Sequence, residues 1–178
     1  MAQVETPALT EVTANASAPE KRKQATWSTG EAAHVVILES GEGFFGIDIN
    51  LVQEIVLMQE ITEVPGSSEY ITGMTDLRGR VVPVAAFSRL LDSEATERTD
   101  DTRILVVEHG SGHIGLIVDA VTEVMLIDGE KIEDATTIGS QDHDFIVAVA
   151  KLDVHLVTLV DINRLLAAAD RVPAAEAA

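Results

Sequence analysis

The chain has 178 residues, of which 46% are hydrophobic, and its 30 acidic and 12 basic side chains give a formal net charge of -18. This length suits one domain with a substantial core, and so negative a charge disfavours binding to nucleic acids or anionic membrane surfaces. The lack of cysteine excludes disulfide frameworks, thiolate nucleophiles and cysteine zinc sites. No apolar stretch approaches the roughly 18 residues that span a bilayer, and the N-terminus lacks a signal-peptide pattern, so we expect a cytoplasmic protein without membrane insertion.

The two ends of the chain read as tails. Residues 1–33 are rich in Ala, Thr, Ser, Glu and Lys, and Trp27 is their one large aromatic residue. Because so little apolar surface cannot offset the entropy lost on ordering, we expect a disordered N-terminal tail. We expect residues 169–178 to be loose as well.

From His34 onward the sequence pattern is typical of an all-β protein. Short runs rich in Val and Ile are separated by Gly, Asp and Ser roughly every eight to twelve residues, which is typical of a barrel or sandwich. Glycine-containing segments at 40–43 and 110–112 are suited to hairpin turns, because glycine accepts a positive φ. The expected strands are 34–39, 44–49, 53–58, 74–77, 81–85, 103–108, 113–118, 121–127, 145–150 and 154–160.

A short helix is expected near the C-terminus. Asp161 is a good N-cap residue, Ile162, Leu165 and Leu166 form one apolar stripe, and Pro173 prevents continuation.

The sequence contains an internal repeat. Residues 38–56 align without a gap with residues 107–125, and 81–91 align with 156–166 in a second register. We therefore predict two related β-units, about 34–92 and 100–168, in a pseudo-two-fold arrangement and joined by the polar segment 92–101. Chance similarity between β-hairpins is the alternative explanation.

Little in the sequence suggests catalysis. His109, His113 and the segment 142–144 could together bind a divalent metal, although solvated loop residues explain them more simply. Glu54 and Glu123 stand at equivalent positions in the two units. We therefore attribute them to the duplication and not to an acid–base pair. We expect no enzyme activity, no cofactor and no metal.

The informative site is the segment 75–84. Gly79 permits a tight turn between two strands, which would place Arg78 at a hairpin tip. Because arginine pairs bidentately with carboxylates and is enriched at interface hot spots, this tip is a candidate recognition surface. A solvated turn arginine is the equally open alternative.

Ordered motifs now identify a family. The chain resembles the CheW-type chemotaxis coupling proteins over about residues 34–168. The motifs that carry the resemblance are Gly46-Ile47-Asp48-Ile49, Val52-Gln53-Glu54-Ile55, Ile61-Thr62-Glu63-Val64-Pro65, Tyr70-Ile71-Thr72-Gly73, Leu77-Arg78-Gly79 with Val82-Pro83-Val84, and Gly115-Leu116-Ile117-Val118-Asp119 with Val121-Thr122-Glu123-Val124.

The resemblance implies a fold of two pseudo-symmetric, five-stranded SH3-like β-barrel subdomains with a short C-terminal helix. It also implies a cytoplasmic, non-catalytic adaptor that links chemoreceptor cytoplasmic tips to the regulatory domain of a CheA-type histidine kinase. Such an adaptor is expected to be a monomer in isolation and to assemble with its partners into rings and arrays at membrane-associated receptors.

The resemblance also implies roles for particular residues. Receptor binding falls to Val52, Glu54, Arg78, Val121 and Val124, and kinase binding falls to Gly73 and Gly79. The three valines are equally explained as core residues.

Two departures from the family pattern leave alternatives open. Asp76 stands where the family usually has Asn, and Ala86-Phe87-Ser88 stands where Asp-Leu-Arg is common, so a polar contact of that second segment is in doubt. One alternative is an adaptor of a non-flagellar chemosensory pathway. The other is a metal-dependent or ligand-binding β-barrel enzyme that uses His109, His113 and His143.

Overall fold

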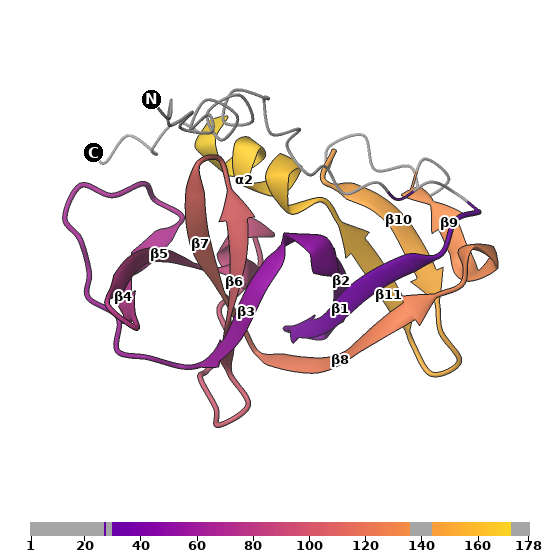
Figure 1. Ribbon diagram of the computed structural model, residues 1–178, viewed down its shortest axis with the longest axis horizontal. Coiled ribbons are helices and arrows are strands. Elements are labelled where there is room, and N and C mark those ends of the chain that lie inside the picture. The colour runs from indigo at the N-terminus through magenta and orange to yellow at the C-terminus, as the bar shows by residue number, and fades with distance from the viewer. Residues whose placement is uncertain (1–26, 28–29, 136–143, 172–178) are drawn as a thin grey trace, which may run out of the picture.

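The computed structural model describes Trp27, residues 30–135 and residues 144–171. The described chain is built almost entirely of strands (Figure 1). They are β1 (Ala33–Ser40), β2 (Gly43–Asp48), β3 (Val52–Leu57), β4 (Ile71–Leu77), β5 (Arg80–Ala86), β6 (Arg103–His109), β7 (Gly112–Val118), β8 (Ala120–Ile127), β9 (Ile132–Asp134), β10 (Ile146–Lys151) and β11 (Leu156–Val160). The α-helices are α1 (Phe87–Leu90) and α2 (Ile162–Arg171), and single 3-10 turns precede β3 and β9. Neither α-helix in the described ranges is long enough to cross a membrane.

The strands form two sheets that lie side by side, with α2 along their upper side in Figure 1. Sheet A has the order β8-β1-β2-β11-β10-β9, and sheet B has the order β3-β6-β7-β5-β4. The all-β class and the C-terminal helix are thus confirmed, although sheet A has six strands and not the expected five. The additional strand, β9, has only three residues and was too short to predict from its pattern.

Each sheet takes strands from both units of the repeat. The hairpin β1–β2 belongs to sheet A, whereas β3 crosses to sheet B and pairs with β6; in the second unit β6–β7 belongs to sheet B and β8 crosses to sheet A. The expected subdomain boundaries at residues 92 and 100 therefore divide the sequence repeat but not the sheets. The local pattern of a strand does not reveal which edge it will join, so this exchange was not predictable.

The pairing registers repeat as the sequence does. Val52 faces Val107 in sheet B, and the equivalent Val121 faces Leu38 in sheet A, each followed by the same one-residue register shift. The parallel pairings also correspond, because Val84 faces Gly115 while Leu159 faces Gly46. Duplication explains this agreement of bulges and registers, and chance similarity between hairpins does not.

Three clusters of buried hydrophobic side chains form the core of the two sheets. One lies within sheet A, one lies within sheet B, and the largest contains residues of both sheets and of both α-helices. In β1, Val35 and Ile37 belong to the cluster of sheet A, whereas Val36 and Leu38 belong to the shared cluster. Burial on both faces explains why this strand is a continuous apolar run and does not alternate.

The folded body begins earlier than we expected. Trp27 packs against the cluster of sheet A, and the backbone of Gly30 lies so close to Gly129 that a Cβ there would be 2.3 Å from the Gly30 carbonyl carbon. Ala33 is buried and opens β1. The assignment of residues 1–33 to a disordered tail is therefore wrong for Trp27 and residues 30–33.

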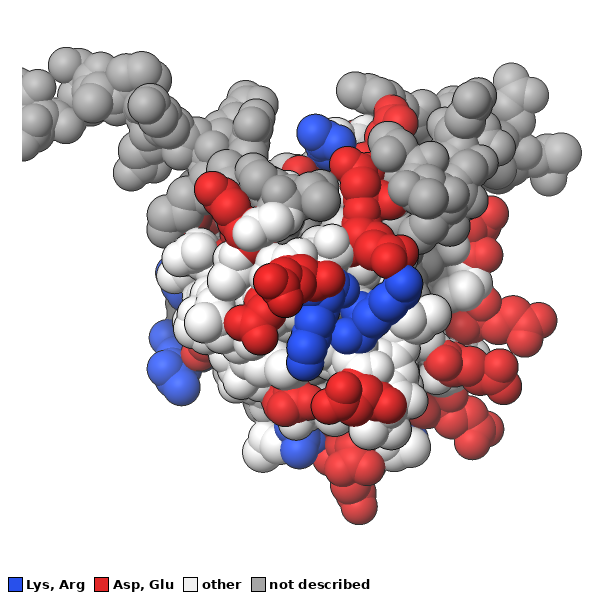
Figure 2. Space-filling model, turned by 90° about the vertical axis from the view of Figure 1, so that its right-hand side faces the viewer, with Lys and Arg blue, Asp and Glu red and all other residues white. Residues whose placement is uncertain are grey.

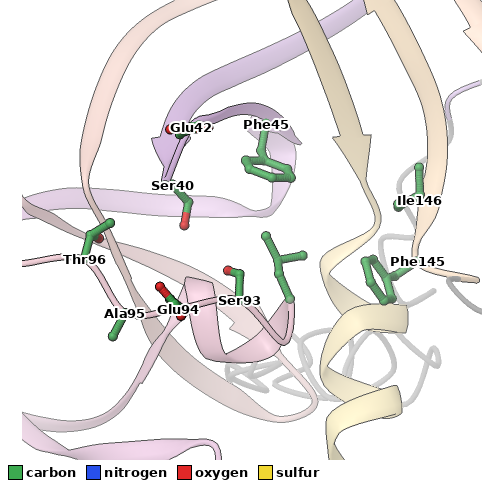
Figure 3. A pocket seen from close by; sticks show the side chains of 11 residues that line it. Ser40, Glu42, Phe45, Ser93, Glu94, Ala95, Thr96, Phe145 and Ile146 are labelled. Carbon is green, nitrogen blue, oxygen red and sulfur yellow. The ribbon is translucent and has the colours of Figure 1, made fainter.

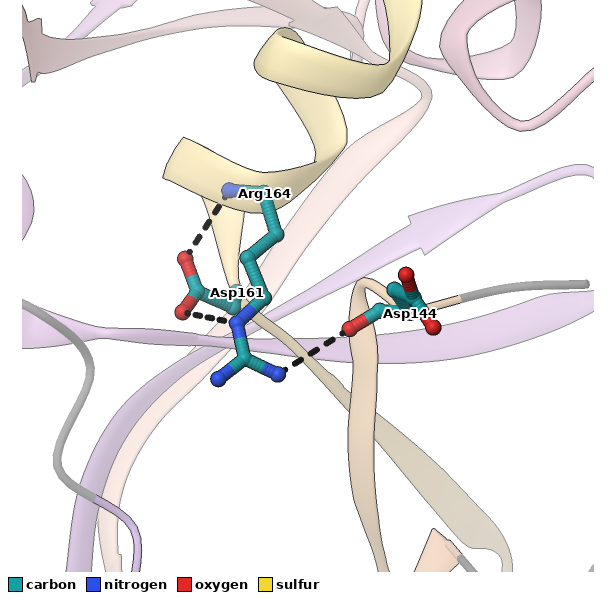
Figure 4. A network of polar contacts seen from close by, with 3 residues as sticks. All are labelled: Asp144, Asp161 and Arg164. Carbon is teal, nitrogen blue, oxygen red and sulfur yellow. Dashed lines mark hydrogen bonds and ion pairs between the residues drawn. The ribbon is translucent and has the colours of Figure 1, made fainter. Parts of the chain in front are cut away.

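The start of α2 is held by a small polar network (Figure 4). The Asp161 carboxylate accepts a hydrogen bond from the Arg164 backbone N–H at 3.2 Å, as expected of an N-cap, and its other oxygen lies 3.5 Å from Arg164 Nε. The Arg164 guanidinium also donates to the Asp144 carbonyl oxygen at 3.3 Å. Near the other end of α2, Asp170 accepts a hydrogen bond from the Tyr70 hydroxyl. Burial and the Asp170 carboxylate raise the pKa of Tyr70 to about 12.

Replacing the N-cap residue should destabilise the fold without abolishing it. We expect Asp161→Ala to lower the free energy of unfolding by about 1 kcal/mol, because a buried N-cap carboxylate is lost. Urea denaturation of the variant beside Asp144→Ala, which keeps the carbonyl that Arg164 contacts, measures the difference. Equal stability of the two variants would contradict the capping role.

Candidate functional site

The β4–β5 hairpin presents Arg78 at its tip. Arg78 and Gly79 form the two-residue turn between the strands with φ values of 55 and 83, and positive φ at both positions is the mark of a type I′ turn. The Asp76 carboxylate accepts a hydrogen bond from the Gly79 backbone N–H at 2.7 Å. The side-chain oxygen of an asparagine could accept the same bond, so this contact does not require an aspartate at position 76.

Glu54 and Arg78, both predicted site residues, meet in space. Glu54 lies on β3 and its carboxylate is 3.6 Å from Arg78 Nη1. The two side chains are 23% and 85% exposed, so the contact fixes the carboxylate while most of the guanidinium remains open to a partner. A surface ion pair of this kind contributes little to stability, which favours a role in recognition.

The meeting of these residues has a structural cause. β3 and β4 are the opposite edge strands of sheet B, but the chain that continues β3 turns back to β4, where Thr62 and Met74 exchange backbone hydrogen bonds of 2.8 Å. The hairpin tip is thereby brought over β3.

The three predicted valines lie in different surroundings. Val52 is the first residue of β3 and Val121 the second of β8, the two strands that cross between sheets. Both valines are partly buried and pack against the shared cluster. Val124 is exposed on β8. Partial burial keeps the core interpretation open for Val52 and Val121, whereas the exposure of Val124 contradicts that interpretation for it.

The two predicted glycines differ more sharply. Gly79 is exposed at the hairpin tip, where its positive φ requires glycine. Gly73 is buried, and a Cβ there would lie 2.4 Å from the Thr62 carbonyl oxygen. Its absent side chain therefore permits the bridge between residues 62 and 74, so a part in kinase binding would be indirect.

Adding one methyl group at Gly73 should separate these roles. We expect Gly73→Ala to destabilise the protein by about 1 to 3 kcal/mol, because the backbone at Thr62 must shift. Gly112→Ala is the matched control, since nothing lies within 4 Å of its added Cβ. Thermal unfolding gives the comparison, and a Gly73→Ala variant as stable as the control would show that the close contact is unimportant.

Sequence reasoning missed a repeated set of exposed apolar side chains. Leu57 and its equivalent Leu126 are 63% and 61% exposed, and Val81 and its equivalent Leu156 are 65% and 60% exposed. Ile55 forms a third such pair with Val124, which was already a predicted site residue. No local pattern marks Leu57, because Ile55-Val56-Leu57 is a continuous apolar run and the structure alone shows which side chains of β3 are exposed. Large side chains left open at corresponding places of both sheets indicate two related contact surfaces.

The segment that departs from the family pattern serves the core. Phe87 and Ser88 are buried, and the Phe87 ring meets Phe45 edge-on with a centroid distance of 5.3 Å. Ser88 accepts hydrogen bonds at its carbonyl from Ser93. In this chain the segment therefore contributes aromatic packing to the core.

Of the candidate metal ligands, the structure describes His109, His113 and Asp144. His109 and His113 lie on the two strands of the β6–β7 hairpin, and Asp142 and His143 are outside the described residues. Within the ranges that the structure describes, no three His, Asp or Glu side chains are arranged to hold a metal ion.

On the face shown in Figure 2, acidic side chains surround a small basic group, in line with the overall charge.

Comparison with known proteins agrees with this architecture. The model of the CheW-like domain family matches residues 34–170. The chain is 32% identical over 139 residues to the chemotaxis protein CheW of Bacillus subtilis, covering 78% of this chain and 88% of that protein. It is 33% identical to protein PilI of Pseudomonas aeruginosa over 81 residues, which is 46% of each chain.

A solved structure is similar as well. The crystal structure of the scaffolding protein TtCheW from Thermoanaerobacter tengcongensis aligns with a TM-score of 0.67 at 32% identity, covering 75% of this chain and 91% of that one.

Proposed function

Because the chain belongs to the CheW-like domain family, we propose that it is a non-catalytic cytoplasmic adaptor between chemoreceptor tips and a CheA-type histidine kinase. The observation that carries the proposal is the exposed Arg78 at a rigid hairpin tip beside Glu54, together with apolar side chains exposed at equivalent places of both sheets. These are features of a protein that binds other proteins.

The receptor surface is centred on Val52, Glu54, Arg78, Val121 and Val124. Arg78 supplies a charged group that can bind carboxylates of a receptor helix, and Glu54 orients it. Val52 and Val121 supply the apolar edge where β3 and β8 leave the shared core.

The kinase surfaces are formed by the exposed side chains of Leu57 and Val81 on sheet B and of their equivalents Leu126 and Leu156 on sheet A, with Gly79 at the tip of the β4–β5 hairpin. The regulatory domain of the kinase has the same fold in this family, so it presents a corresponding pair of ends. Contacts between unlike ends are heterologous, and such contacts close into rings or extend into filaments. Many weak contacts on a receptor lattice reinforce one another through high effective concentration.

Reversing the charge at the hairpin tip tests the receptor surface. We expect Arg78→Glu to weaken binding of a receptor cytoplasmic fragment by about 1 to 3 kcal/mol, as at other interface hot spots, and to leave the melting temperature unchanged. Arg98→Glu, an equal change at an exposed linker residue, is the control. Calorimetric titration with the fragment measures the affinity. A lower melting temperature without a specific loss of affinity would show that Arg78 has a structural role.

Charges placed on the exposed apolar ends test the kinase surfaces. We expect Leu57→Asp and Leu126→Asp each to weaken binding of the kinase regulatory domain by about 1 to 2 kcal/mol while receptor binding is kept, because each removes one apolar contact. Val64→Asp is the control, as Val64 is exposed in the loop before β4. Should every variant lose both partners in equal proportion, the model of separate surfaces would be wrong.

A further inference from the structure

A pocket of about 530 Å³ lies where the β1–β2 turn, the segment after α1 and the start of β10 come together (Figure 3). Its apolar lining comes from Phe45, Leu91, Phe145 and Ile146. The carboxylates of Glu42 and Glu94 stand at its edge, and none of the described residues that line it is basic. It shares no residue with the surface around Arg78.

The internal repeat shows what fills the corresponding place in the other unit. Phe145, Ile146 and Leu91 are equivalent to Tyr70, Ile71 and Leu166, and there the later turns of α2 cover the space. Asp170 of that helix accepts the hydrogen bond of the Tyr70 hydroxyl. Ala169 packs against the same cluster as Tyr70 and Ile71.

The pocket exists because the first unit lacks these turns. α1 has 4 residues against the 10 of α2, and the chain turns away at Asp92, which has a left-handed φ of 56. The space next to Leu91 is therefore left without an equivalent of Ala169, which packs at its counterpart.

The equivalence defines the chemistry of an occupant. Small side chains fit, since Ala169 packs at the counterpart. A basic group is required in place of Asp170, because Phe145 offers no hydroxyl and the edge carries two carboxylates.

We propose that residues 14–23 of this same chain dock in the pocket. They contain the small residues Ala14, Ala16 and Ala18, followed by Lys21-Arg22-Lys23, which holds three of the chain's 12 basic residues. This order of small and then basic side chains matches the lining and the edge of the pocket. The proposal concerns a different surface from the receptor and kinase contacts and does not depend on them.

The anchor at Trp27 makes the contact feasible. Trp27 packs against the cluster of sheet A, which includes Ile37 near the end of β1, and the pocket lies at that end of the strand. The chain from Lys21 to Trp27, which must bring the basic residues to the edge of the pocket, reaches up to about 20 Å when extended. A tether of this length gives an effective concentration on the order of millimolar, so weak contacts suffice.

Limited proteolysis of the full chain tests the docking. Trypsin cleaves after Lys21, Arg22 and Lys23, and mass spectrometry follows the rate at these sites. We expect E42Q/E94Q, which removes the edge charges without adding a trypsin site, to accelerate cleavage there about 3- to 10-fold over the unsubstituted chain, because cleavage follows the undocked population. The control E60Q/E63Q makes the same change at exposed residues elsewhere and should leave the rate as it was.

A second measurement reads the pocket itself. In K21Q/R22Q/K23Q, we expect the amide resonances of Ile146 and Glu94 to shift while that of Arg78 stays unchanged. Equal cleavage rates in the unsubstituted chain and E42Q/E94Q, or unchanged pocket resonances, would overturn the proposal. Protection that grows with protein concentration would also overturn it, because the occupant would then be the tail of a second copy.

Discussion

Burial of both faces of β1 and β6 is the constraint on which the remaining structure depends. In β6, Ile104 and Val106 belong to the cluster of sheet B, and Leu105 and Val107 belong to the shared cluster. A strand buried in this way needs hydrogen-bonding neighbours along both edges, because unpaired backbone groups cannot be left in an apolar interior. One neighbour is its hairpin partner, and the other is the crossing strand of the opposite unit. The exchange of β3 and β8 meets that need and ties the two sheets together.

The same exchange positions the candidate site. β3 and β8 both leave the shared cluster at equivalent valines, so each sheet has a similar apolar edge. The charges differ, however: Arg78 is equivalent to Asp153, and Glu54 is equivalent to Glu123. Sheet B therefore has an ion pair at a place where sheet A has two carboxylates. A partner that makes an ionic contact at one sheet cannot make the same contact at the other, and this difference gives the adaptor two unlike ends.

Local features of the fold were predictable, whereas long-range pairings were not. The apolar patterns of the strands, the glycine turns and the Asp161 N-cap are each encoded within a few residues. The internal repeat is found by aligning the sequence with itself. The contact of Glu54 with Arg78 depends on the bridge between Thr62 and Met74, which no local pattern announces. The packing of Trp27 was not predicted for a related reason. A single aromatic residue in a polar segment does not show which part of the core it will contact.

The two units agree at positions where packing restricts the residue and differ at positions on the surface. Gly46 and Gly115 are kept because a Cβ at either would lie within 2.7 Å of a side chain on the neighbouring strand. The hairpin tips and the helix ends carry no such demand, and there the units differ in charge and in length. Surfaces free to change are the ones that can be fitted to different partners. A duplicated fold can thus become an adaptor by keeping its interior symmetric and letting its two ends diverge.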